Sequence, residues 1–210
     1  MAKNTLLKEP WLKWAIEIQS IAQNGLAYVR DEYDRERYEQ LRDIAAEMLS
    51  YQSDIPKETV KSLFCCDEGY QTPKIDTRAA IFQDGKILLV QEKNGTWSLP
   101  GGWVDVLESV ESNTIKEVKE EAGLNVKPVR IIALQDRKKH NIPVSAYGIC
   151  KVFVLCDLID GEFVPNLETI NSGYFDLNSL PNLAVEKTTY DQIKMCFDAS
   201  KDDNWVTQFD

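Results

Sequence analysis

The sequence has one histidine, five cysteines and no long uninterrupted run of apolar residues. The odd number of cysteines, without CxxC spacing, argues against a disulfide framework and a structural zinc site. No stretch approaches the roughly 18 apolar residues of a membrane-spanning helix. The first residues also lack the apolar core and small-residue cleavage site of a signal peptide. We therefore expect a cytoplasmic protein without a membrane anchor.

Positive charge is also scarce, because 24 Lys and Arg residues stand against 34 Asp and Glu residues and leave a formal net charge of -10. Broad, sequence-independent binding to nucleic acid depends on clustered Lys and Arg that neutralise phosphates. The composition therefore argues against nucleic acid as a partner and fits a protein that recruits cations. A chain of 210 residues can form one well-cored domain and a small companion.

Apolar residues in the first part of the chain recur at helical spacing, which predicts helices over residues 10–27 and 32–51. A third short helix is expected to start with Asp54 as its cap and Pro56 in its first turn. Helices this few bury little apolar surface alone, so their apolar stripes must pack on another domain or subunit. Residues 1–70 are therefore predicted to be a helical dimerisation domain.

Residues 71–210 change to the periodicity of strands. Strands are expected over residues 77–83, 86–91, 97–99, 129–134 and 146–158. Asp84-Gly85 is a strong signal for a two-residue hairpin, and a second turn is expected at Asp160-Gly161. One helix that ends at Ala122 lies among the strands, and another is expected over residues 186–198. This order predicts an α/β fold with a mixed sheet.

Three glutamates, Glu117, Glu120 and Glu121, stand at i, i+3 and i+4 in a helix that we expect to begin after Ser109 and stop at Gly123. The face toward the sheet is expected to consist of Val110, Thr114, Ile115 and Val118. Like charges at this spacing destabilise a helix, and glutamate near its C-terminal end opposes the helix dipole. The cluster is either a solvated acidic face or a carboxylate cage for Mg²⁺ or Mn²⁺, and local spacing does not separate the two.

A longer pattern around these glutamates resembles the Nudix box, G-x5-E-x7-R-E-U-x-E-E-x-G-U, in which U is aliphatic. The matching positions are Gly102, Glu108, Lys116, Glu117, Val118, Glu120, Glu121, Gly123 and Leu124. The preceding TWSLPGG is similar to the Trp-x-Leu-Pro-Gly-Gly segment of the family. The chain departs at Lys116, where the family has an Arg that ties the loop glutamate, here Glu108, to the helix. Lysine keeps the charge but loses the planar, two-pronged geometry.

The resemblance implies a Nudix α/β/α sandwich that hydrolyses a nucleoside diphosphate linked to a moiety X into a nucleoside monophosphate and phospho-X. It also implies Mg²⁺ or Mn²⁺ as cofactor, because a metal ion neutralises the polyanionic diphosphate and positions the attacking water. The implied metal-binding residues are Glu117, Glu120, Glu121 and Gly101.

The general base varies in the Nudix family, so the resemblance leaves two candidates. One is Glu117, and the other is Glu168, in a segment that resembles the family's acidic loop before an aromatic strand. Glu168 could also be an ordinary solvated loop residue. Glu120 and Lys116 complete the expected catalytic set. The expected structural positions of the loop and the helix end are Gly102, Glu108 and Gly123.

Three further residues are candidates for substrate binding. Trp103 follows the double-glycine turn and could stack on a base, or could instead pack over the loop. Arg137 and His140 lie in a basic connection between strands and could contact substrate phosphate, although a polar loop histidine is more often simply exposed.

The helical segment before residue 70 resembles the N-terminal extension of bacterial Nudix enzymes described as ADP-ribose or CDP-choline pyrophosphatases, in which it helps to form a dimer. The resemblance therefore implies a homodimer that acts on a nucleoside diphosphate derivative. Two other classes stay open: a non-catalytic nucleotide sensor on a Nudix fold, and a protein-interaction module built on the helices. The complete set of glutamates argues against the sensor, and Mg²⁺-dependent release of nucleoside monophosphate would distinguish an enzyme from it.

Overall fold

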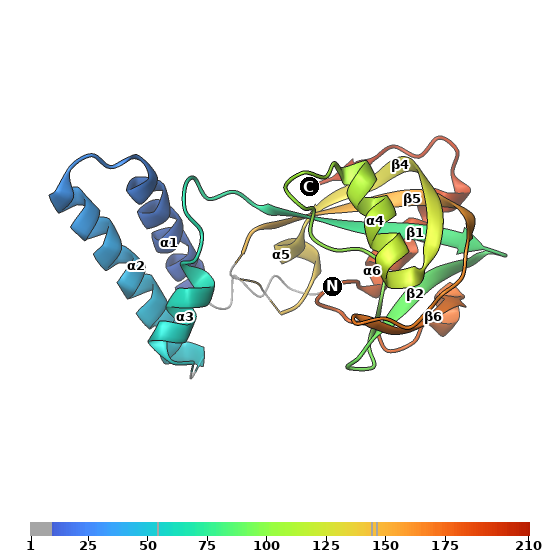
Figure 1. The fold of residues 1–210 in the computed structure, drawn as a ribbon, viewed down its shortest axis with the longest axis horizontal. Coiled ribbons are helices and arrows are strands. Elements are labelled where there is room, and N and C mark those ends of the chain that lie inside the picture. Colours follow the sequence, from blue (N-terminus) through green and yellow to red (C-terminus); the bar gives the residue numbers. More distant parts are fainter. Residues whose placement is uncertain (1–9, 54, 144, 146) are drawn as a thin grey trace. The chain divides into compact units, whose positions relative to one another are not determined.

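The computed structural model describes residues 10–53, 55–143, 145 and 147–210, which form two compact units (Figure 1). The first unit contains the described residues up to Pro73, together with those between Pro143 and Ile149. The second unit contains the rest of the chain.

The described part of the first unit is helical. Its helices are α1 (Pro10–Tyr28), α2 (Glu32–Ser53) and α3 (Lys57–Phe64). The helices predicted over residues 10–27 and 32–51 are confirmed. The predicted start of the third helix was wrong in detail, because Pro56 is the N-cap and the helix begins at Lys57. Asp54, the expected cap, lies outside the described residues.

Helices α1 and α2 pack closely because small residues stand where they meet. Ala15 and Ala22 of α1 and Ala45 of α2 are fully buried. A Cβ atom on Gly25 would lie 2.3 Å from the ring of Tyr38, so any larger residue at position 25 would force that ring to move. The helical hairpin is therefore specified by residue size as well as by apolar spacing.

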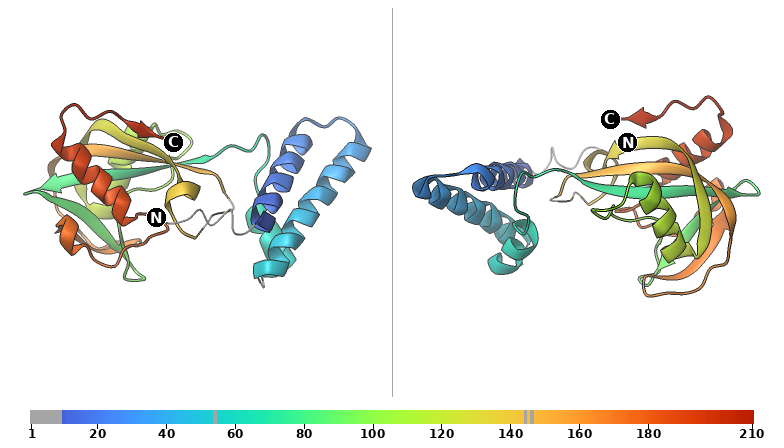
Figure 2. Two further views of the ribbon diagram at one scale, coloured as in Figure 1. Left: turned by 180° about the vertical axis from the view of Figure 1, so that it is seen from behind. Right: turned by 45° about the horizontal axis from the view of Figure 1, so that its top comes forward.

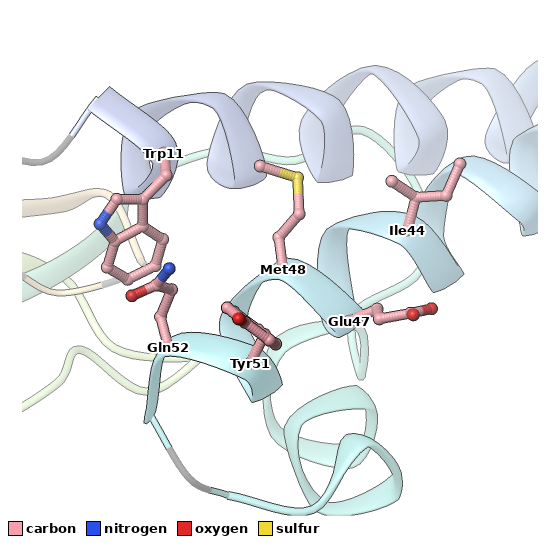
Figure 3. Close-up of a pocket in the computed structure, with 6 residues that line it drawn as sticks. All are labelled: Trp11, Ile44, Glu47, Met48, Tyr51 and Gln52. Carbon is pink, nitrogen blue, oxygen red and sulfur yellow. The ribbon is translucent and has the colours of Figure 1, made fainter.

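The outer surface of the helical unit keeps an apolar stripe and a groove. Trp14, Ile21 and Tyr28 follow one another at intervals of seven along α1 and are 53%, 60% and 71% exposed. A groove of about 440 Å³ lies between α1 and α2. It is lined by Trp11 of α1 and by Ile44, Glu47, Met48, Tyr51 and Gln52 of α2 (Figure 3). Apolar surface of this kind is typical of a protein–protein contact.

The second unit is built on a mixed sheet. Its strands are β1 (Lys74–Gln83), β2 (Lys86–Glu92), β3 (Trp97–Ser98), β4 (Leu124–Asp136), β5 (Ile149–Gly161), β6 (Thr169–Phe175) and β7 (Gln208–Phe209). The strand order is β3-β2-β1-β5-β4-β7, and β6 pairs with β2. The pairs β1–β5 and β4–β7 are parallel, whereas the other pairs are antiparallel.

Helices cover both faces of this sheet, with α4 (Val110–Ala122) on one face and α6 (Tyr190–Lys201) on the other (Figures 1 and 2). Successive side chains of β1 alternate between these faces: Ala79 belongs to the apolar cluster around α4 and Ala80 to the cluster around α6. The predicted α/β/α sandwich is therefore confirmed. No helix among the described residues has both the length and the apolar character needed to cross a membrane.

The hairpin between β1 and β2 forms where the sequence predicts it. Asp84 has a φ of 51° and Gly85 a φ of 74°, the positive values that a tight two-residue hairpin turn requires. The expected strand over residues 129–134 is part of the longer β4. The pairing of β4 with β5 shifts register at several points, one of them directly after Pro128. Proline has no amide hydrogen to donate, and the shift allows the strand to continue beyond it.

The turn predicted at Asp160-Gly161 was wrong, because both residues continue β5 and pair with β4. Gly161 has a φ of 116°, and a Cβ atom there would lie 2.6 Å from the carbonyl oxygen of Gly123. The glycine therefore allows two backbones to approach and does not reverse the chain. The last predicted helix also starts later, at Tyr190, because Thr189 caps it and accepts a hydrogen bond from the Gln192 amide.

Candidate active site

Helix α4 is fixed at both ends by its own sequence, as predicted. The hydroxyl of Ser109 accepts a hydrogen bond from the Ser112 amide at 3.0 Å, and the Ser109 amide donates to the Ser112 hydroxyl at 2.9 Å. Gly123 ends the helix with a φ of 71°, in the left-handed region that glycine adopts without strain. The turn that carries the three glutamates therefore has a defined position along the chain.

Two of the three glutamates lie on the buried face of α4. Glu117 and Glu121 are each 8% exposed, whereas Glu120 is exposed. Val118 is buried as predicted, but Ile115 is 37% exposed, so its predicted contact with the sheet was wrong. The inward stripe follows the spacing of Glu117, Val118 and Glu121, and Ile115 falls beside that stripe. Burial of two carboxylates excludes a simple solvated acidic face.

The double-glycine turn lies against β1. The Thr77 amide donates to the carbonyl oxygen of Gly102 at 2.8 Å, and the Ala79 amide donates to that of Pro100 at 2.9 Å. Gly101 has a φ of 142°, and a Cβ atom on it would lie 2.0 Å from the Thr77 carbonyl oxygen. Position 101 therefore requires glycine, and β1 holds the turn in place through its backbone.

The Gly101 amide donates a hydrogen bond to the Glu121 Oε2 atom at 2.8 Å. Burial raises the pKa of Glu121 to about 7, against the opposing effects of Arg78 and of this amide. A carboxylate whose charge is poorly compensated in this way favours a bound cation or a proton. Glu121 is therefore the most strongly perturbed acid among the predicted site residues.

Glu117 lies against the other glycine of the turn. A Cβ atom on Gly102 would lie 2.6 Å from the Glu117 Oε2 atom, so the absence of a side chain makes room for the carboxylate. Burial raises the pKa of Glu117, whereas the neighbouring Lys116 ammonium acts to lower it. The two glycines thus bring both buried carboxylates to one short piece of backbone.

Lys116 binds a different acid from the one that the resemblance implies. Its Nζ atom lies 2.7 Å from Asp105 Oδ2, 3.4 Å from Glu117 Oε1 and 3.8 Å from Glu120 Oε2. The hydrogen bond with Asp105 raises the pKa of Lys116. The expected tie to Glu108 is thus replaced by a tie to Asp105, three residues earlier in the same loop, and a single ammonium connects the loop to the helix.

The donor set fits a hard divalent cation. Among the described residues, no group of three His, Cys, Asp or Glu side chains is close enough to hold a metal ion. Mg²⁺, however, is usually bound through one or two carboxylates, with water and substrate phosphates completing its shell. Glu117 and Glu121 supply two such carboxylates, and burial has already removed most of their water. The predicted metal contacts of Glu120 and Gly101 stay predictions.

Glu168 is exposed, in a loop that is tied to the end of α4. The Asn166 side-chain amide donates to the carbonyl oxygen of Glu120 at 2.8 Å, and the Thr169 hydroxyl donates to that of Glu121 at 2.6 Å. Asn166 Oδ1 also accepts the Glu168 amide at 2.9 Å. The backbone around Glu168 is therefore fixed to the helical turn of the glutamates, and its role as general base stays a prediction.

The three predicted substrate residues lie in different environments. Trp103 is 53% exposed, so its ring is available for stacking. His140 pairs with the carboxylate of Asp210. Arg137 is 8% exposed, and its guanidinium donates to the carbonyl oxygens of Glu186 and Pro143. The connection that carries Arg137 and His140 forms a short helix, α5 (Arg137–His140), and their contact with substrate phosphate stays a prediction.

Sequence reasoning missed a group of buried charges beside the turn. Asp76 and Arg78 of β1 and Lys151 of β5 are 2%, 4% and 2% exposed. The register of the parallel pair places Asp76 opposite Lys151. Asn113 was also missed: its side-chain amide donates to the Thr77 hydroxyl at 2.9 Å and connects α4 to β1. The available signal for Asp76 and Arg78 was the presence of two opposite charges within a segment of otherwise strand-forming residues.

Comparison with known families identifies the class of this fold and site. Residues 73–194 match the NUDIX domain family. Residues 9–64 match Nudix_N, a family described as a UDP-X-like, N-terminal oligomerisation domain. The chain belongs to the Nudix hydrolase family, as the Nudix-box resemblance implies, and its helical unit matches an oligomerisation domain of that family.

One relative is similar over nearly the whole chain, and another over about half of it. Bacillus subtilis YjhB, whose name assigns it provisionally as an ADP-ribose pyrophosphatase, is 40% identical over 201 residues, which are 95% of this chain and 97% of YjhB. The ADP-ribose pyrophosphatase of Methanocaldococcus jannaschii is 35% identical over 126 residues, which are 56% of this chain and 70% of that protein.

Solved structures agree with these matches. An ADP-ribose pyrophosphatase from Streptococcus suis has a TM-score of 0.63 and 55% identity, and the match covers 66% of this chain and all of that one. A UDP-X diphosphatase has a TM-score of 0.63 and 32% identity, and the match covers 95% of this chain and 98% of that one. The second similarity therefore includes the helical unit.

Proposed function

We propose that this Nudix hydrolase is a metal-dependent pyrophosphohydrolase that cleaves a nucleoside diphosphate linked to X, of the ADP-ribose or CDP-choline type. The products are a nucleoside monophosphate and phospho-X. The observation that carries the proposal is the pair of buried carboxylates, Glu117 and Glu121, packed against the glycines at positions 101 and 102. The names of the relatives, which refer to ADP-ribose and UDP-X, support a substrate of this class.

The site residues have separate tasks in this reaction. Glu117 and Glu121, with Glu120 at the rim and Gly101 beside them, would hold Mg²⁺ or Mn²⁺. The metal, when bound, neutralises the oxygens of the diphosphate and lowers the pKa of water. Lys116 holds the Asp105 loop against the helix. Glu168 is the proposed base that accepts the proton of the attacking water as one phosphorus–oxygen bond of the diphosphate breaks.

The proposal is tested by incubating the purified protein with ADP-ribose, CDP-choline and UDP-glucose, with Mg²⁺ or with EDTA. We expect AMP, CMP or UMP to appear from at least one compound, only when Mg²⁺ is present. Chromatography of the products identifies both halves of the cleaved molecule. Binding of these nucleotides without any release of monophosphate would instead indicate a nucleotide sensor.

Gly102→Ala tests the space that the glycine leaves for Glu117. The added Cβ atom would lie 2.6 Å from the Glu117 Oε2 atom, so the end of a flexible side chain must move. We expect kcat to fall about tenfold or more, because small displacements of catalytic groups are costly, while the melting temperature changes little. Gly148→Ala is the control, since its Cβ atom would meet only ordinary contacts with Pro73 at 3.5 Å. An unchanged kcat in Gly102→Ala would contradict the assignment.

We propose in addition that residues 1–70 form the contact of a homodimer and that residues 71–210 carry the hydrolase site. The match of residues 9–64 to an oligomerisation domain supports this assignment. The exposed apolar stripe of Trp14, Ile21 and Tyr28 supplies surface of the kind that a second copy would cover.

Ile21→Lys should weaken this dimer. A lysine in an apolar contact brings an unpaired charge into each copy of the interface, so we expect the dissociation constant to rise about a hundredfold or more, as at a central interface residue. Sedimentation of the full chain at micromolar concentration measures the change. Ile159→Lys, which alters an isoleucine of β5 that is 63% exposed, should leave the association unchanged. A wild-type chain that sediments as a monomer would contradict the proposed dimer.

A further inference from the structure

Arg78, Asp76 and Lys151 form a buried charge cluster on β1 and β5. Arg78 Nε lies 3.0 Å from Asp76 Oδ2, and Arg78 Nη2 lies 2.7 Å from Asp76 Oδ1. Lys151 Nζ approaches Asp76 Oδ2 at 2.6 Å. Asp76 therefore accepts hydrogen bonds from both cations. Its two carboxylate oxygens form a bidentate pair with the Arg78 guanidinium.

The cluster carries more positive than negative charge, since one carboxylate faces two cations. Burial acts to lower the pKa of Arg78, but Asp76, and then Glu121 and Glu117, raise it overall. The two acids of the candidate active site thus supply the negative charge that the cluster lacks. A buried ionic group is often no more stabilising than apolar residues of similar size, so a gain in stability does not by itself explain this arrangement.

The third hydrogen bond of the Arg78 guanidinium is made with the backbone just before the double-glycine turn. Arg78 Nη1 donates to the carbonyl oxygen of Leu99 at 3.2 Å. Pro100 follows, with its carbonyl oxygen bonded to the amide of Ala79, and the next amide is that of Gly101, which donates to Glu121. A continuous set of contacts therefore runs from Lys151 through Asp76 and Arg78 to the backbone that holds the Glu121 carboxylate.

We propose that Arg78 is a positioning residue of the active site: held by Asp76 and Lys151, it fixes the Leu99–Gly101 backbone and so orients the Glu121 carboxylate for divalent metal. The inference rests on the proposed function, because it requires that Glu121 is a ligand of the metal. Its direct evidence is the hydrogen bond from Arg78 to Leu99 and the bond from Gly101 to Glu121.

Three variants of the full chain test this role. Arg78→Met removes all three hydrogen bonds of the guanidinium and fills part of its volume. Arg78→Lys keeps the charge but cannot reach Asp76 with two prongs and Leu99 with a third. Arg130→Met is the matched control, because Arg130 also donates to backbone carbonyl oxygens, those of Asp202 and Asp203 at the end of α6.

Binding of Mn²⁺ alone, followed by its paramagnetic resonance signal, is the first measurement. We expect the dissociation constant to rise about tenfold or more in Arg78→Met and less in Arg78→Lys, because a misaligned carboxylate is a poorer ligand.

Steady-state kinetics with saturating Mg²⁺ is the second measurement. We expect kcat to fall about tenfold or more while KM changes less than about threefold, as for loss of an interaction made in the transition state. Arg130→Met should lower the melting temperature and keep Mn²⁺ affinity, kcat and KM.

The outcomes separate the inference from the function on which it rests. Wild-type Mn²⁺ affinity and kcat in both Arg78 variants, from an active parent, would overturn the positioning role and leave the hydrolase intact. Losses of Mn²⁺ affinity and kcat in both Arg78 variants that are fully accounted for by the fraction of unfolded protein would also overturn it. If the parent binds Mn²⁺ but cleaves no compound, weaker Mn²⁺ binding in Arg78→Lys would support the positioning role while the proposed hydrolysis fails. If Arg78→Met does not fold, Arg78→Lys carries the same comparison.

Discussion

Glu121→Gln should reduce turnover at least about a hundredfold while the fold stays intact, because it removes a charge that stabilises the transition state through the metal. The side-chain carbonyl oxygen of glutamine can still accept the hydrogen bond from the Gly101 amide, so the turn is expected to keep its conformation. The measurement is kcat with Mg²⁺ and the best substrate of the panel, accompanied by circular dichroism. Glu111→Gln is the control, since Glu111 is an exposed glutamate in the first turn of the same helix.

The same variant should change how stability without metal depends on pH. Burial raises the pKa of Glu121 from its ordinary value of 4.5 to about 7 in the folded protein. The folded state therefore binds the proton more tightly, and this contribution to stability is complete below pH 4.5 and is lost as the pH rises through about 7. At about 1.4 kcal/mol for each pKa unit, the loss is on the order of 3 kcal/mol.

In EDTA at pH 8, Glu121→Gln should therefore melt at a higher temperature than the wild-type protein, and the difference should shrink toward pH 4.5. Thermal unfolding at several pH values measures it. Near-normal Mg²⁺-dependent turnover in Glu121→Gln would refute the proposed role in metal binding. Equal melting temperatures of the two proteins at pH 8 would show that burial of the ionised Glu121 carboxylate does not destabilise the wild-type protein.

Glu168→Gln should lower kcat about a hundredfold with little change in KM, if Glu168 is the general base. The amide can hydrogen-bond the attacking water but cannot accept its proton at neutral pH. Because Asn166 and Thr169 fix the surrounding backbone to the end of α4, the substitution should not move the loop. The acid limb of the pH–rate profile should disappear in this variant.

Glu117→Gln provides the comparison for the general base. If Glu168 is the base, Glu117→Gln should lose activity mainly through weaker metal binding, and additional Mn²⁺ should restore part of it. The reverse pattern, with Glu168→Gln nearly active and Glu117→Gln inactive at every metal concentration, would assign the base to the helix. Two active variants would exclude both residues.

Local sequence was sufficient to predict helix α4 and its glutamates. The cap at Ser109 and the stop at Gly123 act within a few residues, and the spacing of Glu117 and Glu121 places them on one side of the helix. Local sequence could not show which side is buried, because that depends on contacts with β1 and with the double-glycine turn. The expected burial of Ile115 against the sheet was wrong for this reason, since Ile115 is 37% exposed.

The buried charge cluster was beyond prediction for a related reason. Asp76 and Arg78 alternate along β1 with Thr77, a pattern typical of a strand with one face in solvent. Their partner, Lys151, lies 75 residues from Asp76 along the chain. Only the parallel pairing of β1 with β5 brings these charges together. Gly161 was likewise wrongly predicted to form a turn, because the backbone that it approaches, at Gly123, lies far from it in the sequence.

The anchoring of the loop before β6 has a consequence for protein engineering. Asn166 and Thr169 hold their carbonyl partners on α4 through side-chain atoms, whereas Val164 and Leu167 are 68% and 86% exposed. The loop thus consists of fixed anchor points and freely variable positions. A library that randomises the exposed residues 164, 165 and 167 but keeps both anchors should sample new substrate preferences while the metal-binding turn stays assembled. A library that also varies the anchors should consist largely of inactive members.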